Sequence, residues 1–424
     1  MFELTEPLKM LEQALRPYCE KELSAKVEPL EKGEVAVLDI MRDFDRAFGI
    51  NAMVSGALHE MIERKCRRER EGIEEKGSLQ EVLAGEVGEA MDPLLIFIVM
   101  KELCRVSPSF ALSLGAHIGL CGQTILAKGT SDQIENYALP LFSFEKLGCW
   151  ALTEPESGSD AFALSTTAVP DGDFYVLNGS KTFITNAPCA DIFVVYAKID
   201  REDSKADKRM IHPFVLERDN EGLSVGKPMH KMGMRGSPTG QIFLSDARVH
   251  RDQLLGKREK TSRSQAQETL TSEREENAAM AWGIIERCLE ESIKYAVERK
   301  QFGMRLIEFQ LIQEKIARMY VHLENVRNLA FKQAWAMREG RSNILDACAA
   351  KFYAAAAAVE VGMEAIQLMG GYGYIEEQQV ERLTRDAKLL MIGGGTSEIQ
   401  LLNIAKELVR DKGLSLSLTG GLRN

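Results

Sequence analysis

The stretch Arg385–Ile399 reads RDAKLLMIGGGTSEI, a partly apolar run that leads into three successive glycines. Glycine adopts backbone conformations that other residues avoid, so three in a row predict a flexible turn that allows close backbone approach. The surrounding residues 268–410 follow helical periodicity and include alanine-rich stretches such as Ala354–Ala358. The glycine turn is therefore predicted to lie within a C-terminal helical domain.

Upstream of this domain, residues 147–256 have a different texture. Short β-rich runs such as Ile192–Tyr196 are separated by Gly, Asp, Asn and Pro, which predicts strands joined by turns. Residues 1–146 again follow helical periodicity and contain a long apolar stretch, Leu94–Leu103. The order predicts a multidomain α+β protein with an N-terminal helical domain (1–146), a middle β domain (147–256) and a C-terminal helical domain (268–410).

Length and composition exclude several classes of protein. A chain of 424 residues exceeds what one hydrophobic core usually organises. The net charge of -10 argues against nucleic acid as the main partner, because phosphate binding needs a concentrated basic surface. The mixed charges of Glu63–Lys76 are typical of a solvated helix face.

The cysteines and the apolar runs bear on location. The eight cysteines form no CxxC pair and no Cys/His cluster, so we expect no metal site and reduced, mostly packing thiols. No stretch reaches the ~20 apolar residues of a membrane helix, and the chain does not start with a secretory signal pattern. We therefore expect a cytoplasmic protein without a membrane span.

Two turns in the middle domain suit a polar ligand. Cys149–Asp160 (CWALTEPESGSD) reads as an apolar strand that enters a tight, hydroxyl-rich turn with several N–H donors. Asn178–Asn186 (NGSKTFITN) reads as a hairpin-like turn followed by an aromatic residue between hydroxyl residues. Each turn alone is weak evidence, because plain surface turns look similar.

Together, these two turns resemble the flavin-binding segments of the acyl-CoA dehydrogenase family. The resemblance extends to Lys231–Thr239, Glu298–Gly303, Gln367–Tyr374 and Arg385–Ile399. Six segments in the family's order cover residues 148–408 closely. The N-terminal region resembles the family only in general character.

The resemblance implies FAD-dependent oxidation of an acyl-CoA thioester to its α,β-unsaturated form. It implies a helical N-terminal domain, a β-barrel-like middle domain and a C-terminal four-helix bundle, assembled as a homotetramer with an electron-transferring flavoprotein as acceptor. The residues that it places at the flavin or the neighbouring substrate are Trp150, Leu152, Thr153, Gly158, Ser159, Phe183 and Thr185. Those that it assigns to holding FAD, several across a subunit boundary, are Arg299, Gln301, Phe302, Gln310, Gln367, Gly371, Thr396 and Glu398.

Gly394 departs from this pattern, because many family members carry their catalytic glutamate at the aligned position. Thioester α-protons are weakly acidic, so the reaction needs a carboxylate base and donors that stabilise enolate charge on the carbonyl oxygen. In the family, one donor is the backbone N–H at the position of Gly394 and the other is a flavin ribityl hydroxyl. Gly394 retains the N–H and lacks the carboxylate.

Isovaleryl-CoA and long-chain dehydrogenases carry the base on a helix of the bundle, immediately before an arginine. Counting back without gaps from Glu298–Gly303 places that base at Glu273, followed by Arg274, which would contact substrate. Ser272 and Glu275 have the spacing of a capping box, so a glutamate at 273 could equally favour the start of a helix.

Glu276 and Asp92 are the alternative bases. Asp92 precedes Pro93 and an apolar run that resembles the region lining the acyl pocket, and a helix N-cap is the ordinary role of such an aspartate. As a second base, it would serve 1,4-type dehydrogenation of a cyclic or unsaturated acyl-CoA. A flavin-binding relative without dehydrogenase activity and an oxygen-reactive enzyme also stay open, as does the acyl group.

Overall fold

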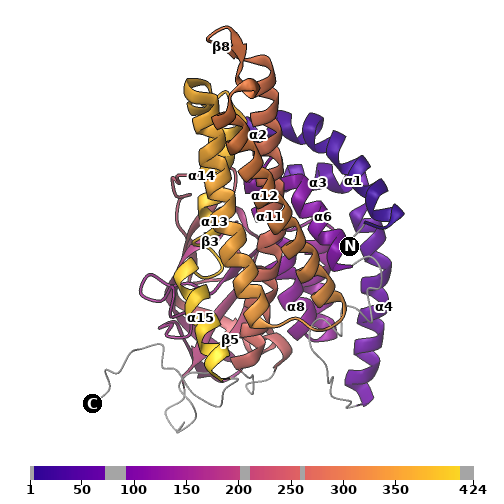
Figure 1. Ribbon diagram of the computed structural model, residues 1–424. Helices are drawn as coiled ribbons and strands as arrows, with labels where there is room; N and C mark the ends of the chain where they lie inside the picture. Colours follow the sequence, from indigo (N-terminus) through magenta and orange to yellow (C-terminus); the bar gives the residue numbers. More distant parts are fainter. Residues whose placement is uncertain (1–3, 72–91, 201–210, 258–262, 411–424) are drawn as a thin grey trace, which may run out of the picture.

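The computed structural model (Figure 1) describes four ranges of the chain: residues 4–71, 92–200, 211–257 and 263–410. For residues 53 and 263–273 it describes the backbone alone. The described chain runs from helices through a sheet and back to helices. The predicted multidomain α+β fold, with a helical domain at each end, is therefore confirmed.

Helices make up the N-terminal region, drawn in indigo and purple in Figure 1. The charged run lies on α4 as far as Glu71, and most of its described side chains are exposed, as predicted. The helices are α1 (Glu6–Tyr18), α2 (Ser24–Lys32), α3 (Val37–Phe48), α4 (Ile50–Glu71), α6 (Pro93–Cys104), α7 (Pro108–Leu114), α8 (Gln123–Lys128), α9 (Ser131–Gln133) and α10 (Leu139–Phe142), with π-helical turns η1 (Cys19–Leu23), η3 (Gly115–Gly122) and η4 (Ile134–Ala138).

The middle domain is one curled sheet of seven strands. Neighbouring strands follow the order β1-β4-β2-β3-β7-β6, and β5 also pairs with β4. Strand β4 pairs in parallel with β1 and β2, and the other pairs are antiparallel. The strands are β1 (Gly148–Ala151), β2 (Thr167–Asp171), β3 (Phe174–Thr185), β4 (Ile192–Ile199), β5 (Ile211–Glu217), β6 (Leu223–Val225) and β7 (Thr239–His250).

The C-terminal domain is a bundle of long helices, drawn in orange and yellow (Figure 1). Helix α11 begins at Arg263, before residue 268, where we predicted the C-terminal domain to start. A short hairpin of β8 (Lys300–Gln301) and β9 (Met304–Arg305) follows α11. The helices are α11 (Arg263–Glu298), α12 (Gln310–Arg338), α13 (Ile344–Met369), α14 (Gln379–Leu390) and α15 (Ser397–Arg410).

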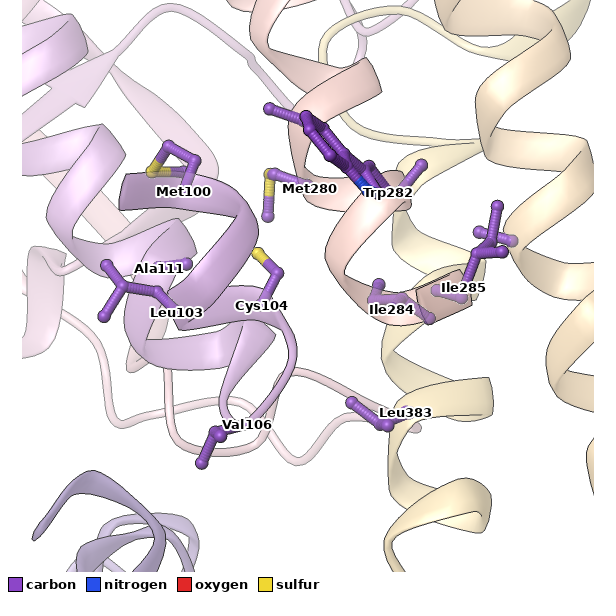
Figure 2. Close-up of a cluster of buried hydrophobic side chains, with 14 of the residues drawn as sticks. Met100, Leu103, Cys104, Val106, Ala111, Met280, Trp282, Ile284, Ile285 and Leu383 are labelled. Atoms are coloured by element: carbon purple, nitrogen blue, oxygen red, sulfur yellow. The ribbon is translucent and has the colours of Figure 1, made fainter. Parts of the chain in front are cut away.

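One hydrophobic core joins the N-terminal helices to the bundle. Figure 2 shows Cys104 of α6 beside Met280 of α11, and both belong to this core. The two helices approach closely at Gly283, where an added Cβ would lie 2.2 Å from the carbonyl oxygen of residue 101. This shared core holds the N-terminal domain against the helix that carries the predicted base.

A buried histidine joins the N-terminal domain to the sheet. His117 accepts a hydrogen bond at Nδ1 from the Gly148 N–H (3.0 Å) and donates from Nε2 to the Leu141 carbonyl (3.0 Å). Burial lowers the pKa of His117 to about 4, because the charged form would lose its hydration. The neutral ring thus supports the start of β1, which leads into the first predicted flavin turn.

The continuous helical stretch Pro108–Lys128 is long and apolar enough to span a membrane by length and composition. In its most apolar window, 61% of the residues are buried inside the protein. A mostly buried core helix passes the same test, so this stretch is weak evidence for a membrane span.

Candidate active site

The glycine turn, Gly393–Gly395, connects α14 to α15. Its backbone has a positive φ at Gly394 (62°) and at Gly395 (93°), a conformation that residues with a Cβ rarely adopt. A Cβ added to Gly395 would lie 2.8 Å from Nε2 of Gln400. The predicted turn is therefore present, and side chains approach its backbone closely.

Side chains from two helices hold the carbonyl oxygens of this turn. The ammonium group of Lys351, on α13, donates to the carbonyls of Gly393 and Gly395, the latter at 2.6 Å. Nε2 of Gln400, on α15, donates to the Gly395 carbonyl at 2.8 Å and to the Gly394 carbonyl at 3.4 Å. Within the described ranges, the Gly394 N–H has no hydrogen-bond acceptor. A main-chain donor is thus left available to a ligand.

Helix α11 passes beside this turn with a dense set of polar residues. Arg274 is buried, and its Nη2 lies 3.9 Å from the position of a Cβ added to Gly395. Oε2 of the partly buried Glu276 lies 3.8 Å from the position of a Cβ added to Gly119, in η3. The helix therefore directs a cation toward the glycine turn and a carboxylate toward the N-terminal domain.

Glu273, the predicted base, lies in α11 immediately before Arg274, but its side chain falls outside the described residues. The capping-box interpretation of Ser272 and Glu275 is wrong, because α11 begins at Arg263 and both residues lie inside it. The helix dipole acts within the first turn, so it does not explain a glutamate at position 273.

Glu275 is fully buried instead of capping a helix. Neither carboxylate oxygen has a hydrogen-bonding partner of good geometry among the described residues. Burial raises the pKa of Glu275 to about 8, opposed in part by the nearby Ser342 hydroxyl. The spacing from Glu275 to the buried Ala278 and Ala279 is that of one helix face, a sequence signal that indicates this burial.

Asp92 is the N-cap of α6, as its position before Pro93 predicts. Its Oδ1 accepts a hydrogen bond from the Leu94 N–H at 2.9 Å. This bond satisfies a free donor at the start of the helix. The capping role is confirmed, and a catalytic role for the carboxylate stays a prediction.

A buried ion pair ties together the two predicted flavin turns. Nζ of Lys181 donates to Glu154 Oε1 (2.8 Å) and to the Leu152 carbonyl (3.1 Å). Glu154 also accepts bonds from the main-chain N–H and hydroxyl groups of Ser165 and Thr166. The Lys181 ammonium and these donors outweigh desolvation and lower the pKa of Glu154 to about 2.

The residues predicted at the flavin or substrate in these turns divide by exposure. Leu152 is buried, and Trp150 packs edge-on against Tyr196 with ring centroids 5.1 Å apart. Phe183 is 68% exposed and has a φ of 58°, at an irregularity in the β3–β7 register. The remaining four are half-buried or exposed: Thr153, Gly158, Ser159 and Thr185.

The predicted FAD residues of the bundle fall at its two ends. Phe302, in the β8–β9 hairpin, is 93% exposed at the end of the bundle opposite α15 (Figure 1). Along α11, the 24 residues from Arg274 to Glu298 span roughly 36 Å. Exposed with Phe302 are Arg299, Gln301, Gln310, Gln367 and Gly371, whereas Thr396 and Glu398 lie by the glycine turn. Within one protomer, the hairpin residues therefore lie far from the glycine turn.

Sequence reasoning missed four residues of this site: Lys351, Gln400, Glu154 and Lys181. Glu154 and Lys181 stand inside the two recognised turns, so opposite charges in paired motifs were an available signal. Lys351 stands 42 residues before the carbonyl that it binds, in an alanine-rich helix. Sequence spacing carries no signal for that contact.

Comparison with known proteins bears on all three domains. Acyl-CoA dehydrogenase family models match as N-terminal domain (residues 57–145), middle domain (149–247) and C-terminal domain (263–409). The chain is 38% identical to the caffeyl-CoA reductase-Etf complex subunit CarC of Acetobacterium woodii, over 96% of this chain and 99% of that protein. It is 41% identical to the 3-(aryl)acrylate reductase of Clostridium sporogenes, over 76% of this chain and 85% of that protein.

Solved structures agree with these matches. The butyryl-CoA dehydrogenase of Megasphaera elsdenii superposes with a TM-score of 0.81 at 33% identity, over 97% of this chain and 100% of that chain. The chain therefore belongs to the acyl-CoA dehydrogenase family of oxidoreductases.

Proposed function

We propose that this protein is an FAD-dependent oxidoreductase that acts on the α,β carbon–carbon bond of an acyl-CoA thioester and exchanges electrons with an electron-transferring flavoprotein. The observation that carries the proposal is the Gly394 N–H, which has no acceptor among the described residues, beside the polar segment of α11. A main-chain N–H in this position suits the oxygen of a thioester carbonyl as charge develops on it.

The middle-domain turns fit a flavin. The Glu154–Lys181 pair holds their backbones together, and the Thr182 N–H donates to the Thr153 carbonyl at 2.9 Å. The exposed, left-handed Phe183 supports a role in binding, because such backbone strain is often kept at functional sites. Bound FAD would supply the acceptor for the hydride of the β-carbon.

We assign removal of the α-proton to Glu273. In a helix, positions 273, 276 and 277 share one face, and Glu276 on that face lies near η3 of the N-terminal domain. For Glu273 to act, a thioester whose carbonyl accepts from the Gly394 N–H must place its α-carbon at this face. Arg274, beside the turn, would favour negative charge on the same carbonyl.

A second direction of the same reaction has its own support. The two relatives above are named for reducing aryl-acrylate and caffeyl groups, and one matches 96% of this chain. In this direction the protein would reduce an aryl-acrylyl-CoA with electrons from the flavoprotein, and Glu273 would return a proton to the α-carbon.

We propose assembly as a homotetramer, and the exposure of the hairpin residues supports it. A second copy would cover the exposed hairpin and bring Arg299, Gln301 and Phe302 to the middle-domain turns of its neighbour. We place the reaction in the cytoplasm.

An anaerobic titration tests the function. Oxidised protein is mixed with straight, branched, aromatic and alicyclic acyl-CoA thioesters, and protein reduced by dithionite is mixed with cinnamoyl-CoA and crotonyl-CoA, while the flavin absorbance is followed. Bleaching by one saturated class, or recolouring by one unsaturated class, identifies direction and acyl group. Flavin that responds to no thioester in either direction would contradict the proposal.

The base has a matched test within the same helix. Glu273→Gln should slow flavin reduction roughly 10²–10⁴-fold, the range for loss of a general base. Glu276→Gln is the control on the same face and should retain most of the rate. The reverse result would assign the base to Glu276.

A further inference from the structure

Lys351 is a buried charge that the proposed reaction does not yet use. It lies in α13, its side chain is about 2% exposed, and its ammonium donates to two carbonyls of the glycine turn. Burying an ammonium group is unfavourable unless hydrogen bonds compensate for the lost hydration. The hydrogen bonds of Lys351 to the glycine turn must therefore compensate for its burial.

The geometry of the peptide group links these bonds to the Gly394 N–H. In a trans peptide, the C=O of one residue and the N–H of the next lie in one plane and point in opposite directions. The Gly393 carbonyl and the Gly394 N–H belong to the same peptide group. When Lys351 holds that carbonyl toward α13, the Gly394 N–H is directed away from α13.

Gln400 acts on the peptide groups that follow. Its Nε2 donates to the carbonyls of Gly394 and Gly395, so the N–H groups of residues 395 and 396 are oriented by the same rule. Lys351 shares the Gly395 carbonyl with Gln400. Because glycines at positive φ have no Cβ to restrict them, these side-chain bonds help to set the orientation of the turn, together with the backbone bond from the Ser397 N–H to the Met391 carbonyl (3.0 Å).

The charge of Lys351 also affects the peptide group that it orients. A hydrogen bond from a cation to a carbonyl is stronger than a neutral one and polarises the whole peptide group. Polarisation of the Gly393 carbonyl makes the Gly394 N–H a stronger donor. The ammonium charge also favours negative charge developing beyond that N–H.

We propose that Lys351 is a positioning residue for the reaction: it orients and polarises the peptide group whose N–H receives the thioester oxygen at Gly394. The proposal rests on the proposed function. Gln400 supports the same turn from α15.

Substitution of Lys351 by methionine tests the proposal, because methionine fills the same volume without donating. We expect Lys351→Met to slow flavin reduction roughly 10- to 100-fold, less than the loss of a whole oxyanion donor. Lys332→Met is the matched control, since Lys332 forms a half-exposed ion pair with Asp346 on the same bundle and should leave the rate unchanged.

A second measurement reports on the carbonyl directly. Crotonyl-CoA or cinnamoyl-CoA, whichever class the titration identifies, is labelled with ¹³C at the thioester carbonyl, and its infrared stretch is recorded on oxidised protein. The wild type and Lys332→Met should lower this frequency equally. In Lys351→Met, the frequency should return most of the way to that of the free ligand. A residue needed only for folding would not change the frequency of ligand bound to folded protein.

The outcomes separate two failures. If Lys351→Met lowers the frequency as much as the wild type does, the inference is overturned and the proposed function stands. If the wild type neither reacts with a thioester nor shifts its carbonyl, the proposed function fails first. Should Lys351→Met not fold, Lys351→Gln, which carries no charge, is measured in its place, and an unchanged frequency and rate in that variant would overturn the inference.

Discussion

Two turns of this protein rest on buried lysines, and the comparison separates a supporting role from an orienting one. In the middle domain, Lys181 binds the Glu154 carboxylate and joins two segments of the sheet. In the bundle, Lys351 binds carbonyls of the turn itself. We therefore expect changes at the first turn to affect stability most, and changes at the second to affect catalysis most.

Removal of one member of the ion pair should have the largest effect. Glu154→Gln leaves the Lys181 ammonium buried without its carboxylate, and we expect a loss of about 3–5 kcal/mol in the free energy of unfolding, together with lower flavin content. Denaturant unfolding and the ratio of flavin to protein absorbance measure both.

The exposed pair Lys146–Glu217, 2.9 Å apart against 2.8 Å for the buried pair, provides the control. Glu217→Gln should cost at most about 1 kcal/mol. Equal losses from both variants would show that the buried pair is no more important than a surface one, and the comparison would break down.

Acid should lower the free energy of unfolding through His117, which supports the sheet. Its pKa is about 4 in the folded protein against 6.5 in the unfolded chain, so the unfolded state binds the proton between these values. The contribution is complete above pH 6.5 and declines as the pH falls, by about 3 kcal/mol at pH 4. A His117→Gln variant should lack this slope; parallel stability curves for variant and wild type would refute the assignment.

On the bundle side, Glu275 should respond to pH in the opposite sense. Its pKa is about 8 when folded and 4.5 when unfolded, so the folded state holds a proton that the unfolded state releases. Because only the folded state holds this proton, the free energy of unfolding falls progressively from pH 4.5 to pH 8. Glu275→Gln should therefore raise the free energy of unfolding by about 2–3 kcal/mol at pH 7 and by little at pH 4.5. A constant difference across that range would be inconsistent with a buried, neutral carboxyl group.

The smallest effect is expected for Asp92→Asn. Asparagine caps helices as well as aspartate does, so stability should change by less than about 0.5 kcal/mol. Turnover with straight-chain acyl-CoA should also stay the same. A selective loss with an alicyclic or already unsaturated thioester would instead favour the second base.

The sequence was informative where local patterns decide the structure. The Asp92-Pro93 cap, the left-handed glycines and the order of the three domains follow from nearest neighbours and periodicity. The Ser272-to-Glu275 pattern misled because a helix-favouring stretch begins at Arg263, and a capping sequence inside a continuing helix has no free N–H to satisfy.

Other features depend on contacts between distant segments. The bond from Lys351 to the Gly393 carbonyl spans 42 residues, and the approach of Glu276 to Gly119 links two domains. Neither contact has a local pattern, since a single lysine in an alanine-rich helix is usually solvated. The residues that shape the turn therefore could not be predicted from sequence spacing alone.

The donor at Gly394 has an evolutionary consequence, because it belongs to the main chain and not to a side chain. Any substitution at position 394 other than proline leaves this N–H in place. Within such a lineage, the acid–base group can be lost from the turn and gained on another helix while the oxygen-binding group is inherited unchanged. The acid–base function and the oxygen-binding function can then change separately, so a change of acyl group need not rebuild the turn.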